Sequence, residues 1–125
     1  MQFKFRMGTR VYFGADCIKS NREEIAAAGT RCLIVTGRYS GKASGALDEV
    51  VSVLDELSID YYIFDRVENN PSLENVEEGG RAAREFNADF IIGIGGGSPL
   101  DASKAVAVLA VNNMNPVELF KNSFP

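Results

Sequence analysis

The chain has 125 residues, of which 46% are hydrophobic and 24% charged, and its net charge at pH 7 is −4. This length and composition are typical of one globular domain with its own core, spanning 1–125. The acidic balance argues against nucleic acid or an anionic membrane surface as a partner. No apolar stretch reaches the roughly 18 residues of a membrane-spanning helix, and no signal-peptide core is present, so we expect a cytoplasmic protein.

Apolar and polar residues alternate near the N-terminus. Phe3 and Phe5, then Val11 and Phe13, lie on either side of a glycine-containing turn at 7–9. This period-two pattern predicts an N-terminal β-hairpin. An open outer strand rich in aromatic rings would also offer a pairing surface for a homodimer, unless the rings pack on the domain's own core.

Further along, short apolar runs alternate with amphipathic segments. A short helix is predicted over 22–28, ending at Gly29, and three strand–helix units follow it. The helix after the second strand is expected to begin at Ser72 as N-cap, with Glu74 in its first turn. The predicted strands are the apolar runs 32–35, 61–64 and 90–94.

Strands that alternate with helices of this length predict an α/β fold. We therefore expect a Rossmann-like parallel sheet flanked by helices, with the N-terminal β-hairpin added to it. Ligands of such sheets bind outside the carboxyl ends of the strands.

The third predicted strand runs directly into Gly95-Gly96-Gly97. Glycines at this point can turn tightly and let an anion contact the main chain. Ser98 and Pro99 are predicted at the N-cap and first position of the next helix, with Asp101 two residues further on. The free N–H groups and positive dipole end of that helix would then face the glycines, which indicates a phosphate-binding site.

The same run also allows a purely structural interpretation, and the chain departs from two familiar motifs. The glycines can simply form a tight turn, with Asp101 and Lys104 as a weak ion pair. The G-x-G-x-x-G fingerprint is not met, because Ser98 occupies the place of its third glycine. The P-loop pattern fails at 37–43, where one residue is missing between the glycines and Ala43 replaces the Ser or Thr that binds the metal.

The run GGGSPLDASKA at 95–105 is similar to the G-G-G-S-x-x-D-x-x-K signature of the iron-containing (group III) alcohol dehydrogenases. The stretch SGALDEVVSVLDEL at 44–57 looks closest to butanol-dehydrogenase-like members. The resemblance covers essentially the whole chain, because similar segments also stand at 11–14, 33–37, 64–67, 70–72 and 89–93.

The resemblance implies a dehydroquinate-synthase-like N-terminal domain that binds NAD(P)(H). Its site residues would be Gly96, Gly97 and Ser98 at the coenzyme pyrophosphate beside Gly95, Asp101 and Lys104 toward the nicotinamide, and Asn70 at the adenosine portion. NAD-dependent members commonly carry an acid where this chain has Gly37, followed by Arg38. A guanidinium can bind a 2′-phosphate bidentately, so we expect NADP(H) to be preferred over NAD(H), although Arg38 can equally be a solvated loop charge.

The chain contains no histidine. In the family, the metal (Fe²⁺, or Zn²⁺) is held by one Asp and three His of a C-terminal helical domain, which we expect to be absent here. We therefore predict no catalytic or metal-binding residue in this chain, and no activity from it alone. The intact enzyme would transfer hydride between the coenzyme and a primary alcohol or aldehyde. A stand-alone nucleotide-binding module and part of a glycerol-dehydrogenase-like enzyme remain alternatives.

Overall fold

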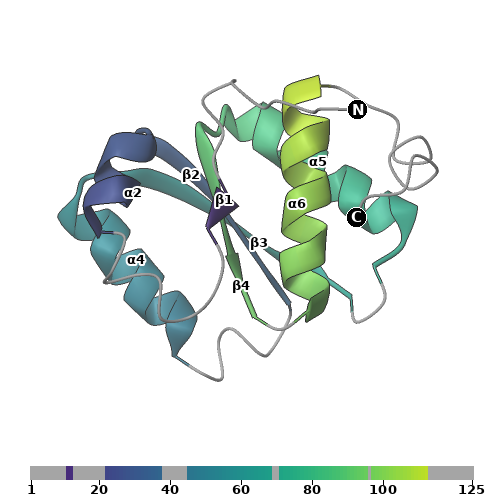
Figure 1. Ribbon diagram of the computed structural model, residues 1–125, viewed down its shortest axis with the longest axis horizontal. Coiled ribbons are helices and arrows are strands. Elements are labelled where there is room, and N and C mark those ends of the chain that lie inside the picture. Colours follow the sequence, from purple (N-terminus) through teal and green to yellow (C-terminus); the bar gives the residue numbers. More distant parts are fainter. Residues whose placement is uncertain (1–10, 13–21, 38–44, 69–70, 96, 113–125) are drawn as a thin grey trace.

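The computed structural model describes residues 11–12, 22–37, 45–68, 71–95 and 97–112. Within these ranges the chain forms a four-stranded parallel sheet with helices on both faces (Figure 1). The predicted α/β fold is therefore confirmed. In chain order, the elements are β1 (Val11–Tyr12), α2 (Arg22–Ala28), β2 (Arg31–Gly37), α4 (Ala46–Glu56), β3 (Asp60–Val67), α5 (Leu73–Phe86), β4 (Phe90–Ile94) and α6 (Gly97–Asn112).

The strands do not follow one another across the sheet in chain order. Their spatial order is β1-β4-β2-β3, so the chain passes from β2 to its neighbour β3 and then returns across β2 to β4. The α4 connection packs on one face of the sheet, and α5 and α6 pack on the other (Figure 1). β2 and β4 are therefore neighbours whose following helices lie on opposite faces.

The second arm of the predicted N-terminal hairpin joins this main sheet. β1 pairs with β4 in parallel, with Val11 opposite Ile91 and Tyr12 opposite Ile92. The first arm, with Phe3 and Phe5, lies outside the described residues. The hairpin itself and the homodimer surface on it stay predictions.

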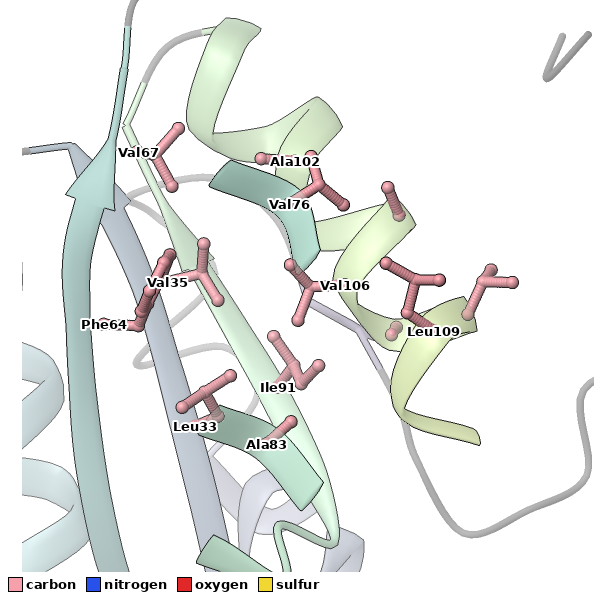
Figure 2. Packing of buried hydrophobic residues seen from close by; sticks show 13 residues of the cluster. Leu33, Val35, Phe64, Val67, Val76, Ala83, Ile91, Ala102, Val106 and Leu109 are labelled. Carbon is pink, nitrogen blue, oxygen red and sulfur yellow. The ribbon is translucent and has the colours of Figure 1, made fainter. Parts of the chain in front are cut away.

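Two apolar clusters cover the two faces of the sheet. The first joins the sheet to α5 and α6 (Figure 2), and its members include Leu33, Val35, Phe64, Val67, Val76, Ala83, Ile91, Val106 and Leu109. The second joins the sheet to α2 and α4, and its members include Ile25, Cys32, Ile34, Leu47, Val50, Leu54, Phe90, Ile92 and Ile94. Because β2 and β4 contribute alternate residues to the two clusters, both strands are buried on both faces, as their continuous apolar runs predict.

β3 contains one irregularity, close to its carboxyl end. Val35 of β2 pairs with Phe64, but Gly37 pairs with Val67, so three steps along β3 face two along β2. This extra residue is a β-bulge, and it resets which face each later side chain occupies. Phe64 and Val67 consequently both reach the cluster under α5 and α6, although a regular strand would place them on opposite faces.

Candidate functional site

The carboxyl ends of β2 and β4 lie side by side at one edge of the sheet. Thr36 of β2 pairs with Ile94, the last residue of β4. Gly37 and Gly95, which come next, therefore stand at neighbouring positions. Because the chain continues from them to helices on opposite faces, this point is a topological switch, where open α/β sheets bind their ligands.

The main chain becomes accessible at Gly95. This glycine has a φ of 131°, a conformation that residues with a Cβ rarely adopt, and it is exposed after five buried residues of β4. α6 begins two residues later, at Gly97. The N–H groups of its first turn have no partner within the helix, and its positive dipole end lies on the same side. This arrangement can hold an anion such as a pyrophosphate.

The start of α6 corrects one detail of the sequence interpretation. Ser98 was expected as N-cap and Pro99 as first helical residue, whereas the helix begins at Gly97 and contains both. The residue before the helix, Gly96, lies outside the described residues. Glycine accepts this earlier start because its backbone is sterically unrestricted, and Pro99 still lies in the first turn, where its missing N–H costs no helical hydrogen bond.

Close packing of α6 on β4 fixes the position of the helix. Ser103 is fully buried, and its hydroxyl donates a hydrogen bond of 2.8 Å to the carbonyl oxygen of Pro99. A Cβ on Gly93 would lie 2.5 Å from the Ser103 hydroxyl oxygen. The first turns of α6 therefore rest directly on the bare backbone of β4, which sets the distance between the helix start and Gly95.

The predicted site residues are partly brought together. Gly37 is buried at the end of β2, Gly95 is exposed at the end of β4, and Asp101 and Lys104 are exposed on the early turns of α6. Gly97 and Ser98 are described by their main chain, in the first turn of α6. The predicted site residues outside the described ranges are Arg38, Asn70 and Gly96.

The connection from β3 to α5 reaches the same edge, because Val67 pairs with Gly37. Ser72 caps α5 as predicted, since its hydroxyl oxygen accepts a hydrogen bond of 3.0 Å from the main-chain N–H of Asn75. The Asn75 side chain bonds Arg66 and Glu68 at the end of β3. Sequence reasoning missed this residue, although a polar side chain directly before the buried Val76 is a usable signal.

Thr36 is the second residue that sequence reasoning missed. It is fully buried, and within the described part of the chain its hydroxyl oxygen has no hydrogen-bond partner. A buried hydroxyl without a partner is costly, and this one lies directly before Gly37 at the carboxyl end of β2. The sequence signal was the change from Val35 to Thr36 just before the glycine.

The opposite edge of the sheet carries the main electrostatic feature of the described residues. The Asp89 carboxylate accepts hydrogen bonds from the main-chain N–H of Thr30, at 2.7 Å, and from that of Arg31, at 3.2 Å. The N–H of Thr30 is the principal reason that the pKa of Asp89 lies below its ordinary value. Because Asp89 precedes the amino end of β4, this cluster stabilises the edge remote from Gly95.

Two kinds of feature are absent from the described ranges. No group of three or more His, Cys, Asp or Glu side chains is placed there to hold a metal ion. None of the helices in these ranges has the length and apolar character required to cross a membrane.

Known proteins of one family resemble this chain in sequence and in fold. The family model "Iron-containing alcohol dehydrogenase" matches residues 8–124. The crystal structure of an iron-containing alcohol dehydrogenase from Thermotoga maritima superimposes with a TM-score of 0.78 at 41% identity, covering 97% of this chain and 34% of that one.

Three dehydrogenases are similar to the chain in sequence. The long-chain primary alcohol dehydrogenase AdhA of Thermoanaerobacter ethanolicus is 37% identical over 98% of this chain. The NADH-dependent butanol dehydrogenase B of Clostridium acetobutylicum is 35% identical over 95%, and the NADPH-dependent butanol dehydrogenase of Clostridium saccharobutylicum is 34% identical over 82%. The chain spans only 32%, 30% and 26% of these three enzymes, in that order.

Proposed function

Since the chain belongs to the iron-containing alcohol dehydrogenase family, we propose that it forms the part of such an enzyme that binds the nicotinamide coenzyme. The observation that carries the proposal is the exposed Gly95, which joins β4 to the start of α6 at the switch point between β2 and β4. The whole enzyme would transfer hydride between this coenzyme and a primary alcohol or aldehyde.

The residues of the chain bind and orient; they do not react. Main-chain N–H groups from Gly95 to Ser98 hold the pyrophosphate, helped by the positive end of α6. Asp101 and Lys104, exposed on the next turns of that helix, lie toward the nicotinamide side. The bound coenzyme supplies the hydride acceptor or donor. We place the Fe²⁺ or Zn²⁺ ligands of the whole enzyme outside these residues, since the chain spans 32% of the length of its relative AdhA.

The preference for NADP(H) over NAD(H) is part of the proposal. Gly37 ends β2 at the switch point, so no carboxylate stands there to repel a 2′-phosphate. The next residue in the sequence, Arg38, would supply a guanidinium for that phosphate. Because NADH-dependent and NADPH-dependent relatives are both similar to the chain, the preference is argued from Gly37 and Arg38 alone.

Amide NMR of the isotope-labelled 125-residue chain tests the binding site. We expect titration with millimolar NADPH to shift the amide signals of Gly37, Gly95 and Gly97, and to leave those of Thr30 and Asp89 at the opposite edge unchanged. Shifts confined to the opposite edge, or none at all, would overturn the proposed site. Millimolar concentrations are required because we expect the chain alone to bind weakly.

The same titration with NADH tests the preference. A lower dissociation constant for NADPH supports the role of Gly37 and Arg38, whereas tighter binding of NADH refutes it. An Arg38→Met variant, which keeps the length of the side chain and removes its charge, should bring the two constants together. Assays of the chain alone with primary alcohols should give no turnover.

A further inference from the structure

Asn75 is a buried polar residue whose bonds all lead to the connection between β3 and α5. The residue lies in α5 and is only 7% exposed. The side-chain oxygen accepts a hydrogen bond of 3.0 Å from the N–H of Glu68, and the side-chain nitrogen donates one of 2.8 Å to the carbonyl oxygen of Arg66. Both bonds of the amide thus go to the main chain.

These two bonds copy the pairing of a parallel strand. In a parallel ladder, one residue bonds the carbonyl before and the N–H after the residue that it faces. The Asn75 side chain likewise bonds the carbonyl before Val67 and the N–H after it, on the side of β3 that does not face β2. The side chain thereby acts as a single strand residue, and it holds the last position of β3 directly after the bulge.

Asn75 also holds the far end of the connection. Its main-chain N–H donates to the hydroxyl oxygen of Ser72, at 3.0 Å, so Glu68 and Ser72 are both bonded to one residue. The connection leaves β3 beside Gly37, because Val67 is the partner of Gly37 in the sheet. The place of the connection at the coenzyme edge is therefore set by Asn75 at both of its ends.

We propose that Asn75 is a positioning residue for coenzyme binding: it holds Glu68 and Ser72, the described ends of the β3–α5 connection, at the carboxyl end of β3 beside Gly37, without contacting the coenzyme itself. This inference rests on the proposed function, in which Gly37, the partner of Val67 in the sheet, borders the coenzyme. Removing the amide deletes the two bonds that tie the Arg66 carbonyl and the Glu68 N–H to α5, so the connection is no longer held in this position. A shifted connection binds the coenzyme less well.

The test compares three variants of the chain by NADPH titration in amide NMR. Asn75→Ala removes both side-chain bonds, and Asn75→Asp keeps the shape and the acceptor for Glu68 but sets an acceptor against the Arg66 carbonyl. The control is Val76→Ala, which removes a neighbouring core side chain of the same helix, 2% exposed, and leaves both bonds in place. Thermal unfolding of each variant measures the loss of stability separately.

We expect the dissociation constant for NADPH to rise in both Asn75 variants, about fivefold in Asn75→Asp, which loses one bond, and further in Asn75→Ala, which loses two, since one hydrogen bond is worth roughly a fivefold change. The Glu68 amide should exchange its hydrogen faster in Asn75→Ala only. If Asn75→Ala does not fold, the isosteric Asn75→Asp decides alone. Unchanged binding in the Asn75 variants, or equal weakening by Val76→Ala at the same stability, overturns the inference. Failure of the unaltered chain to bind NADPH overturns the proposed function instead.

Discussion

Gly93 of β4 and Ser103 of α6 touch so closely that a methyl group on Gly93 would lie 2.5 Å from the Ser103 hydroxyl oxygen and 3.1 Å from its Cβ. This contact has two effects. It packs the core on the α5 and α6 face, and it holds the start of α6 at a fixed distance from Gly95. A change here should therefore alter both stability and coenzyme binding.

The Gly93→Ala variant is expected to lower the free energy of unfolding by about 1–3 kcal/mol, because an added methyl group overpacks a tight core site. Denaturant unfolding measures this loss. In a Ser103→Ala background the nearest atom is gone, so the cost of Gly93→Ala should be smaller than in the unaltered chain. Strictly additive losses would show that the two residues are not in the contact described.

Gly95→Ala should weaken NADPH binding about tenfold, because a Cβ strains a backbone with φ of 131° by about 1–3 kcal/mol and disturbs the main chain at the proposed pyrophosphate site. The matched control is Asn87→Ala, which also strains a residue with positive φ, 57°, at the C-terminal end of α5. NADPH titration should be normal in the control. Equal weakening by both variants would attribute the effect to stability alone.

Stability should fall in acid partly through Asp89. Its pKa lies below the ordinary value in the folded chain, chiefly because of the Thr30 N–H. The stabilisation is therefore present above the ordinary Asp pKa and disappears as pH falls through the lower, folded-state pKa. Thermal midpoints of Asp89→Asn and of the unaltered chain should converge at low pH. The exposed Asp48→Asn on α4 serves as control, and a constant difference for Asp89→Asn across the whole range would contradict the assignment.

Thr36→Val is expected to raise the free energy of unfolding by about 1 kcal/mol, since it replaces a buried hydroxyl that lacks a partner among the described residues with a methyl group of similar size. Thr36→Ala, which removes the hydroxyl and leaves a cavity, should not gain this stability. Chemical denaturation of both variants measures the difference. A loss of stability in Thr36→Val would mean that the hydroxyl is bonded.

Much of the fold was predictable because its signals are local. The run Phe90–Ile94 is apolar throughout and is a strand with the same bounds, and Ser72 caps α5 as its position before an amphipathic segment indicates. The short helix Arg22–Ala28 also has the predicted bounds, since Gly29 stops it. Patterns that span about ten to twenty consecutive residues are set by local backbone preferences.

What escaped prediction depends on contacts between distant segments. The predicted strand at 61–64 gives no sign of the bulge between Phe64 and Val67. The bulge is needed only because β3 must fit both β2 and the core under α5. The place of β4 beside β2 likewise follows from packing on two faces. The role of Asn75 required the end of β3 to be in place, because its partners are main-chain atoms that carry no sequence signal.

The Asn75 side chain has one further consequence, for contacts with other molecules. β3 is the last strand on its side of the described sheet, and the outer edge of such a strand offers free main-chain groups to any extended peptide. On either side of Val67, the Arg66 carbonyl and the Glu68 N–H already bond the side-chain amide of Asn75. A peptide that paired with the outer edge of β3 would have to end before Val67. The two bonds that hold the β3–α5 connection therefore also block strand pairing at this end of β3.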